Sequence, residues 1–275
     1  MSGDSEGYTD LHSHLVPGVD DGARTLEEAR DGIRRMRDLD VRRMVTTPHL
    51  DGSLTRDKGV LQARLEEIDK AWESLRKMAE VEFEDLELHR GHEVMLDIPD
   101  PDLSDPRLRL ADTSFVLVEW PGLRVPPSPL PVLDRIRDSG VRPIIAHPER
   151  YRGLDKELSL PGEWKARGAL LQVNFGSLLG RYGDTPKRRA LTLLERGWVD
   201  LMASDFHGRA HLSPSLDEAR EALSDLGGDE HFGLLARLNP TRILRGEDPV
   251  AVPPLILQPG VWQRLKEVLQ PKGRR

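Results

Sequence analysis

The chain has no cysteine among its 275 residues. This absence excludes disulfide bonds, thiolate-metal sites and the cysteine nucleophile that many phosphatases use. Any bound metal ion must therefore be held by nitrogen and oxygen atoms. Any hydrolysis must use water or a hydroxyl group as its nucleophile.

Long apolar runs and an excess of basic residues are missing as well. No run of about 18 apolar residues occurs, so we expect no membrane insertion. The first residues, Met1 to Gly7, are polar and acidic and lack the apolar core of a signal peptide, so we expect a cytoplasmic protein. The net charge of −7 argues against a nucleic-acid partner, because a phosphate backbone selects a basic surface.

Short β-rich apolar runs alternate with longer amphipathic stretches along most of the chain. Strands are expected at Tyr8–Leu11, Val41–Thr46, Leu86–His89, Phe115–Val118, Val141–Ala146, Ala169–Val173 and Val199–Ala203. Helices are expected at Thr25–Leu39, Thr55–Glu80, Pro129–Ser139, Pro186–Arg196 and Ser213–Leu226. Strand alternating with helix predicts parallel pairing, and seven such units favour a closed barrel over an open sheet.

We therefore predict one α/β domain over residues 1–275, folded as a distorted (β/α)7 barrel of the TIM type. Residues 1–7 are expected to be disordered. From Pro240 the alternation weakens, so residues from about 240 to 275 are expected to pack on the barrel as a C-terminal extension, with a final helix near Trp262–Leu269. Helix ends carry further signals: TLEE from Thr25 and SLDE from Ser215 are typical of capping boxes. Gly140 and Gly197 follow helices where a left-handed residue is needed.

Each expected strand delivers a polar side chain at its carboxyl end. These segments are Asp10-Leu-His-Ser-His14, Thr46-Thr-Pro-His49, Gly91-His-Glu93, Glu119, His147-Pro-Glu-Arg150, Asn174 and Ser204-Asp-Phe-His207. In (β/α) barrels, active sites form on this face because the loops after the strands converge there. The pairs His12-x-His14 and Asp205-x-His207 are two residues apart, which directs both members to one side of an extended chain.

Eight of these side chains are candidate metal ligands, and all of them offer nitrogen or oxygen. They are His12, His14, His49, Glu93, Glu119, His147, Asp205 and His207. Eight ligands are too many for one tetrahedral ion and fit two or three divalent ions that share a carboxylate, for which Glu93 is the candidate. A single His-x-His pair is a weak signal, but eight residues at consecutive strand ends are hard to explain as surface histidines.

Other polar residues have competing interpretations. Asp20 and Asp21 either orient His12 or His14 as outer carboxylates or simply form a turn. His89, His92 and His231 do not share the ligand pattern, whereas His211 could line the mouth of the site. Asn174 is expected to donate or accept a hydrogen bond in the site. Trp120, Tyr151 and Tyr182 are either apolar walls for an aromatic ring or core residues.

At these residues the chain resembles the PHP (polymerase and histidinol phosphatase) superfamily, and more narrowly the bacterial capsular-polysaccharide-type protein tyrosine phosphatases. The matching segments are Asp10-Leu-His-Ser-His14 with Asp20-Asp-Gly22, Thr47-Pro-His49, Gly91-His-Glu93, Glu119, His147-Pro-Glu-Arg150-Tyr151, Asn174, Ala203-Ser-Asp-Phe-His207 and Asn239-Pro240 with Ile243-Leu244. The resemblance implies a barrel of the PHP type and a trinuclear site at the eight residues above, with manganese first and iron or zinc as alternatives.

The resemblance also assigns Arg150 to the substrate phosphate. A second family arginine lies a few residues beyond the Asp-x-His pair; Arg209 is the nearest here, although Leu212 is closer to the expected place. In this chemistry, clustered divalent ions turn water into hydroxide at neutral pH and stabilise phosphoryl charge. Arg150 would add a bidentate clamp unless it forms an ordinary salt bridge with Glu149 or a helix carboxylate. A proton for the leaving group could come from water on a metal ion or from His207.

The sequence therefore predicts a metal-dependent phosphoesterase. The resemblance implies that its substrate is phosphotyrosine in a protein, namely a bacterial tyrosine kinase of capsule or exopolysaccharide biosynthesis. Three alternatives stay open. A small-molecule phosphatase of the histidinol-phosphate type would share the same metal core. An amidohydrolase also begins with His-x-His but usually places a carboxylated lysine where this chain has Glu119. A non-catalytic scaffold would be expected to have lost some of the ligands.

Overall fold

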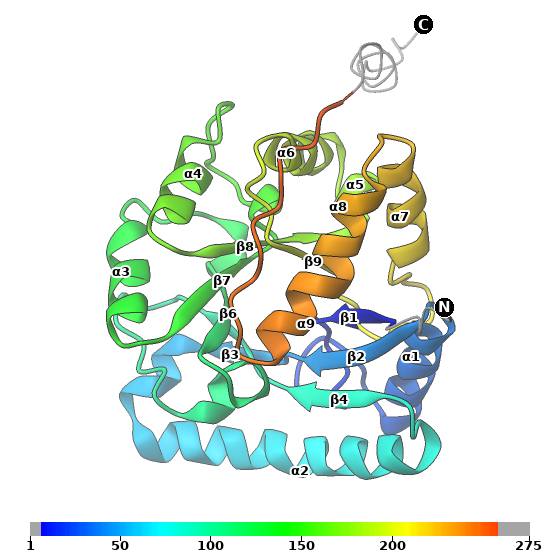
Figure 1. The fold of residues 1–275 in the computed structure, drawn as a ribbon. Helices are drawn as coiled ribbons and strands as arrows, with labels where there is room; N and C mark the ends of the chain where they lie inside the picture. Colours follow the sequence, from blue (N-terminus) through cyan, green and yellow to red (C-terminus); the bar gives the residue numbers. More distant parts are fainter. Residues whose placement is uncertain (1–6, 258–275) are drawn as a thin grey trace, which may run out of the picture.

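Parallel strands form two sheets at the centre of the computed structural model, which describes residues 7–257 (Figure 1). The first sheet has the order β1-β2-β4 and contains β1 (Tyr8–Asp10), β2 (Val41–Thr46) and β4 (Glu87–Arg90). The second has the order β3-β5-β6-β7-β8-β9 and contains β3 (His49–Asp51), β5 (Glu93–Met95), β6 (Phe115–Glu119), β7 (Arg142–Ala146), β8 (Leu170–Asn174) and β9 (Leu201–Ala203). All seven expected strands are present, so the prediction of a parallel α/β fold is confirmed.

The two short strands β3 and β5 were not expected from the sequence. They continue β2 and β4 after brief interruptions at Thr47–Pro48 and Gly91–His92. Pro48 has no N–H to give to a strand partner, which breaks the ladder at that point. As a result, His49 and Glu93 begin new strands instead of lying in loops, and the parallel register sets them side by side.

The two sheets also meet along the segment that follows β1. The backbone N–H of Thr47 donates to Ser13 at 2.7 Å, and that of His14 donates to Phe206 at 2.8 Å. A parallel bridge joins Ser13 to Phe206, just beyond β9. The residues between β1 and the first long helix therefore connect the edge of one sheet to the far edge of the other.

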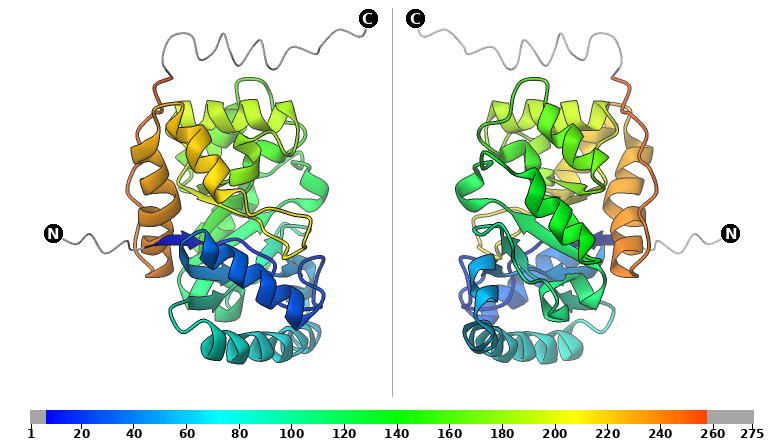
Figure 2. Two further views of the ribbon diagram at one scale, coloured as in Figure 1. Left: turned by 90° about the vertical axis from the view of Figure 1, so that its right-hand side faces the viewer. Right: turned by 90° about the vertical axis from the view of Figure 1, so that its left-hand side faces the viewer.

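Helices surround the sheets on their outer side, as the side views show (Figure 2). The longer ones are α1 (Leu26–Asp38), α2 (Lys58–Glu82), α3 (Leu130–Asp138), α4 (Ser159–Ala166), α6 (Asp184–Glu195) and α7 (Leu216–Ser224). The shorter ones are α5 (Phe175–Leu178), α8 (Asp229–Gly233), a π-helical turn (Leu234–Leu238) and α9 (Asn239–Leu244). All five expected helices form, with ends shifted by one to three residues. Helix α4 was missed because Pro161 and Gly162, both poor helix formers, lie inside it.

The helix-end predictions have different outcomes. Thr25 Oγ1 accepts a hydrogen bond from the N–H of Glu28 at 3.2 Å, so the N-cap is confirmed, but Glu28 accepts from the N–H of Arg24 instead of Thr25, so the capping box forms only in part. The capping box at Ser215 is wrong: its φ of 63° turns the hydroxyl away from the helix, and the hydroxyl donates to the carbonyl of Ser213 instead. Gly140 (φ 81°) and Gly197 (φ 64°) have the expected left-handed conformation.

The apolar core has two parts, separated by the strands. Along β6, Val116 and Val118 belong to a large cluster that faces the helices, whereas Phe115 and Leu117 belong to a smaller one on the opposite face. This alternation is the period-two pattern of a strand that is buried on both faces. The smaller cluster receives side chains from β2, β6, β7, β8 and β9, and Ile243 of α9 joins it.

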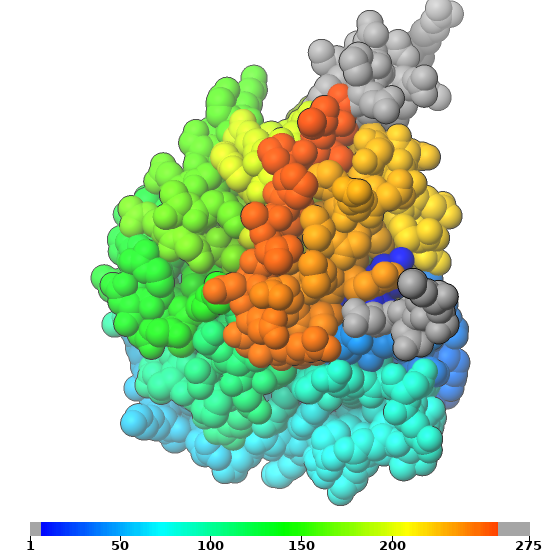
Figure 3. Space-filling view, in the orientation of Figure 1, coloured from blue at the N-terminus to red at the C-terminus, as the bar shows by residue number. Residues whose placement is uncertain are grey.

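The segment after α9 lies along one face of the molecule as a continuous band (Figures 1 and 3). Val252 and Leu255 are buried there, and the N–H of Leu255 donates to Leu194 at 2.9 Å. The helix expected at Trp262–Leu269 lies outside the described residues, as do residues 1–6 of the segment expected to be disordered. Gly7, the last residue of that segment, is described and buried, which does not agree with disorder. None of the helices within residues 7–257 combines the length and apolar character needed to cross a bilayer.

Candidate metal centre

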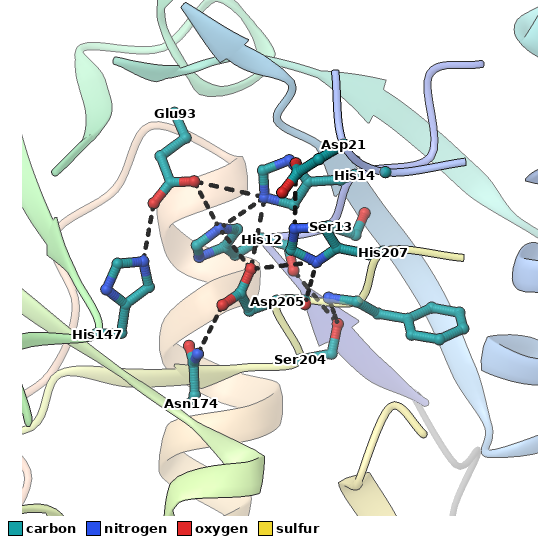
Figure 4. Close-up of polar contacts among 12 residues, drawn as sticks. His12, Ser13, His14, Asp21, Glu93, His147, Asn174, Ser204, Asp205 and His207 are labelled. Carbon is teal, nitrogen blue, oxygen red and sulfur yellow. Dashed lines mark hydrogen bonds and ion pairs between the residues drawn. The ribbon is translucent and has the colours of Figure 1, made fainter. Parts of the chain in front are cut away.

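The structure brings all eight candidate ligands together: His49 and Glu93 begin β3 and β5, and the other six end or follow a strand. Figure 4 shows His12, His14, Glu93, His147, Asp205 and His207. Their nitrogen and oxygen atoms fall into four overlapping groups, and within each group the atoms lie within 4.8 Å of one another. The groups are His12, Glu93 and His147; His12, His14 and Asp205; His49, Glu93 and Glu119; and His14, Asp21, His49 and His207. The overlap indicates room for more than one ion.

Glu93 lies at the junction of these groups. Its Oε2 is 3.2 Å from His12 Nε2, 3.4 Å from His14 Nε2 and 3.2 Å from His49 Nδ1. Its Oε1 is 3.0 Å from His147 Nε2. Asp205 faces the same histidine pair, with Oδ1 3.3 Å from His12 Nε2 and 3.5 Å from His14 Nε2. One fully buried carboxylate therefore contacts four imidazoles, which is the geometry of a bridging ligand.

The tautomers of the first histidine pair can be assigned from their outer partners. His12 Nδ1 donates to Gln172 Oε1 at 2.9 Å, and His14 Nδ1 donates to Asp20 Oδ2 at 2.8 Å. With those protons placed, the two Nε2 atoms face each other across 3.1 Å, beside the carboxylates of Glu93 and Asp205. Two imidazole nitrogens at this separation need a cation between them, and a metal ion there would replace the protons that the carboxylates attract to this pair.

A further imidazole nitrogen supports the same fit. Among the described residues, Nδ1 of His49 is buried and makes no hydrogen bond, whereas His147 contacts Glu93 through Nε2 and leaves its buried Nδ1 unpaired. For His49 this holds although Glu93 Oε2 is only 3.2 Å away, because the alignment is wrong for a direct hydrogen bond. A buried nitrogen directed at a carboxylate without a hydrogen bond is well placed to share an ion with it.

A chain of side-chain amides behind the cluster fixes the orientation of the ligands. Gln172 Nε2 donates to Asn174 Oδ1 at 2.8 Å, and Asn174 Nδ2 donates to Asp205 Oδ2 at 2.8 Å. The chain thus runs from His12 to Asp205 through two residues of β8. Asn174 was expected to form a hydrogen bond in the site and does so. Gln172 was missed, although its position two residues before Asn174 on a strand places both on one face.

The two aspartates after the first histidine pair have different positions. Asp20 binds His14, and it also accepts from the N–H groups of Gly22 and His49, so its predicted orienting role is confirmed for His14. Burial raises the pKa of Asp20, but the hydrogen bond and charge of His14 outweigh it and lower the pKa to about 2. Asp21 Oδ1 lies 3.4 Å from Nε2 of His49 and 3.4 Å from Nε2 of His207, a ligand-like position that the sequence did not reveal.

The ionisable groups show that the cluster favours positive charge. Burial lowers the pKa of His12, but the charges of Glu93 and Asp205 raise it to about 9. Burial raises the pKa of Glu93, but the charge of His12 and the hydrogen bonds it receives hold it well below the usual range. Burial raises the pKa of Glu119 to about 8, and the charge of Glu93 adds to this rise. A cation among these groups would stabilise both carboxylates in their charged form.

Arg150 lies at the edge of the cluster, in the short turn after β7. Its Nη1 donates to Asp205 Oδ2 at 2.7 Å, and its guanidinium lies 4.2 Å from the centre of the Tyr182 ring. The salt bridge of Arg150 is therefore with the candidate ligand Asp205 and not with Glu149 or a helix carboxylate, the alternatives considered from the sequence. Glu149 is fully buried and accepts from the hydroxyl of Ser177 at 2.6 Å and the N–H of Asn174 at 3.1 Å.

Arginines of three helices hold the loops of the site from behind. Arg189 of α6 donates to the carbonyl of Tyr151 at 2.6 Å, next to Arg150. Arg64 of α2 donates to the carbonyl of Val19 at 2.6 Å, and Arg35 of α1 donates to that of Arg209 at 3.0 Å. These charge-assisted hydrogen bonds satisfy loop carbonyls and restrict the backbone beside the candidate ligands.

The remaining residues singled out in the sequence lie as follows. Arg209 Nη2 donates to the carbonyl of Asp21 at 2.8 Å. Trp120 and Tyr151 are core residues, with ring centroids 5.5 Å apart, whereas Tyr182 and His211 line a pocket beside the cluster. Like His211, three other histidines lie outside the metal-type groups: His89 contacts Glu87, His92 contacts the carbonyl of Arg107, and His231 contacts that of Pro253.

Gly22 allows the closest backbone approach in the site and yields a testable prediction. A Cβ at this position would lie 2.1 Å from the carbonyl oxygen of His14 and 2.5 Å from its Cβ. Gly22→Ala must therefore push His14 out of place, and we expect about a tenfold loss of turnover with a lower thermal midpoint, since overpacking costs about 1–3 kcal/mol. Gly233→Ala is the matched control, because a Cβ there meets nothing within 4 Å. Equal midpoints and metal contents for the two variants would contradict this account.

Comparisons with known proteins identify the family of the chain. Residues 8–245 match the family model described as capsular polysaccharide synthesis, CpsB/CapC. The tyrosine-protein phosphatase YwqE of Bacillus subtilis is 30% identical over 253 residues, which cover 89% of this chain and 94% of the relative. The tyrosine-protein phosphatase CpsB of Streptococcus agalactiae is 31% identical over 251 residues, covering 86% and 98%.

Solved structures give the same result. A structure from the study of YwqE from Bacillus subtilis and CpsB from Streptococcus pneumoniae, described as unique metal-dependent tyrosine phosphatases, superimposes with a TM-score of 0.74 at 26% identity. It covers 91% of this chain and 99% of the solved chain. An amidohydrolase from Mycoplasma synoviae shares the fold alone, with a TM-score of 0.51 at 13% identity. The resemblance seen in the sequence is confirmed, and the chain belongs to the CpsB/CapC family of capsular polysaccharide synthesis.

Proposed function

We propose that this chain is a metal-dependent protein tyrosine phosphatase. The observation that carries the proposal is the pair of imidazole Nε2 atoms, of His12 and His14, that face each other beside two buried carboxylates. The names of the relatives, tyrosine-protein phosphatases, and the metal dependence of the solved structure support it. The substrate would be a phosphotyrosine-bearing protein; we propose a bacterial tyrosine kinase of capsule or exopolysaccharide biosynthesis, in line with the description of the family.

We propose that two or three divalent ions are held by the eight candidate ligands, with Glu93 as the bridge. Imidazole and carboxylate groups without thiolates suit manganese, iron or zinc, of which manganese is our first choice. When bound, such ions provide hydroxide from water at neutral pH and neutralise the charge of the phosphoryl group. Asp21 is close enough to His49 and His207 to join the set.

The roles of the nearby side chains follow from their contacts. Arg150 would clamp two phosphoryl oxygens, because its planar fork already faces the cluster through Asp205. His207 donates from Nδ1 to the carbonyl of Asp205 at 2.9 Å, which leaves the lone pair on Nε2. We therefore favour His207 as a ligand over a role as proton donor. The assignment of Arg209 as the second phosphate-binding group stays a prediction. To bind phosphate, its guanidinium would have to break the hydrogen bond to the carbonyl of Asp21.

We further propose that the two sheets form one distorted seven-stranded barrel within a single domain. The hydrogen bonds from Thr47 to Ser13 and from His14 to Phe206 support closure at both edges. The small apolar cluster, with contributions from strands of both sheets and from α9, supports an enclosed interior. The cytoplasmic location and the absence of nucleic-acid partners and membrane insertion stay predictions.

A histidinol-phosphate-type phosphatase is the second candidate, since it would use the same ligands. The metal-stripped chain, reloaded with manganese, iron or zinc in turn, should hydrolyse a phosphotyrosine peptide with a kcat/KM at least about tenfold above that for histidinol phosphate, because the pocket has an aromatic wall at Tyr182. A preference for histidinol phosphate would reverse the order of the two candidates. A chain that binds no transition metal and stays inactive after loading would instead indicate a scaffold.

A further inference from the structure

A pocket of about 490 Å³ opens beside the candidate metal centre. Asp205 and His207 form part of its wall, so the pocket and the cluster are continuous. This volume is within the range of small-molecule sites, and it exceeds what a phosphoryl group alone would fill. The pocket can therefore hold the part of the substrate that lies beyond the phosphate.

Two arginines line this pocket at different depths. Arg150 is the inner one: it is bonded to the candidate ligand Asp205, and 21% of its side chain is exposed. Arg181 is the outer one: it follows α5, donates to Glu218 of α7 at 3.0 Å, and has 43% of its side chain exposed. The guanidinium of Arg150 therefore lies next to the metal-type cluster, and that of Arg181 lies at the outer rim of the pocket.

Apolar side chains line the same pocket as these two arginines. Tyr182 and Leu212 both line the pocket, and each is 38% exposed, which is unusual for large apolar residues of this chain. Arg150 packs against the Tyr182 ring at 4.2 Å. An aromatic ring attached to a phosphoryl group at the inner arginine would contact Tyr182 and Leu212, and the peptide chain beyond the ring would pass the outer arginine.

We propose that Arg181 is a specificity-determining residue that binds the carboxylate of an acidic residue next to the phosphotyrosine. The inference rests on the proposed function. Arg181 already binds a carboxylate, that of Glu218, and this ion pair is exposed on both sides, with 43% and 48% of the side chains accessible. Exposed pairs of this kind contribute little energy, so a substrate carboxylate can share the guanidinium or replace Glu218.

The test compares wild type with Arg181→Gln on three substrates: an aryl phosphate without a peptide, a phosphotyrosine peptide with flanking glutamates, and the same peptide with glutamines. We expect Arg181→Gln to lower kcat/KM for the acidic peptide by about tenfold, mainly through a higher KM, with the loss confined to that substrate. Arg181→Glu should in addition favour a peptide with flanking lysines. Arg188→Gln is the control, because Arg188 is exposed on α6 and lines a different pocket.

The outcomes separate the two proposals. Equal losses on all three substrates would overturn the inference and assign Arg181 to the phosphate or to the fold. No loss on the acidic peptide, or no gain on the lysine peptide with Arg181→Glu, would overturn it as well. A wild-type chain that is inactive on all three substrates after metal loading would contradict the proposed function itself.

Discussion

Replacement of Glu93 by glutamine is expected to reduce the metal content and to lower kcat/KM for an aryl phosphate by about a thousandfold. The carboxylate contacts His12, His14, His49 and His147 through its two oxygens. An amide keeps the size of the side chain but loses the negative charge, and its NH₂ group would face imidazole lone pairs that are needed for metal. The change therefore affects every ion that shares this ligand.

The measurement is elemental analysis of the purified variant together with steady-state kinetics under excess manganese. Glu87→Gln is the matched control, since Glu87 lies on β4, just before the segment that carries Glu93, and its side chain is 56% exposed. Wild-type metal content and turnover in Glu93→Gln would rule out the bridging role and, with it, the proposed arrangement of the ions. Thermal unfolding of both variants distinguishes the loss of ligands from a loss of the fold.

The positions of the eight candidate ligands could be predicted because they depend on short-range rules. A strand followed by a polar residue places that residue at the carboxyl end of a parallel sheet, where all such ends meet. This reasoning needs no knowledge of the loops, so it was sufficient for Glu119 of β6 and for His147 after β7. It was also sufficient for His12 and His14, whose spacing of two is preserved by the bridge at Ser13.

The spacing of two also predicted that Asp205 and His207 both reach the cluster. The prediction is correct, but its reason, an extended chain, is wrong. Asp205 has a φ of 52°, so the chain at Asp205-Phe-His207 is not regularly extended, and the left-handed conformation of Asp205 changes the directions of the two side chains. His147 has a φ of 35°, another left-handed residue that no alternation pattern reveals. Such conformations cost energy in non-glycine residues, and their presence beside the cluster is typical of functional sites.

The features that were missed depend on long-range contacts. Asp21 comes near His49 and His207 only because Asp20 binds His14 and the N–H of His49 and so fixes the turn. The partner of Arg150 is Asp205, which is 55 residues away along the chain and could not be distinguished from Glu149 in the sequence. The interruption that creates β3 follows from Pro48, whose effect depends on the neighbouring strands.

Replacement of Arg150 by glutamine is expected to lower kcat/KM by about a hundredfold or more while the metal content stays that of wild type. In this it differs from Glu93→Gln, which is expected to lower both quantities. Arg150 contacts Asp205 from the pocket side at Oδ2, whereas Oδ1 of Asp205 faces His12 and His14. The ligand atoms therefore stay in place when the guanidinium is removed, but the phosphoryl group loses its charged clamp.

Arg150→Lys separates charge from geometry in the same position. An ammonium keeps the positive charge but cannot form two parallel hydrogen bonds to phosphoryl oxygens, so we expect it to recover only part of the lost activity. Arg152→Gln is the control two residues further along, at an exposed position of the same loop. Loss of metal in Arg150→Gln would make Arg150 a support of Asp205, and full activity in Arg150→Lys would mean that charge alone suffices. If both variants behave as expected, metal binding by Glu93 and phosphate binding by Arg150 are separable functions of neighbouring side chains.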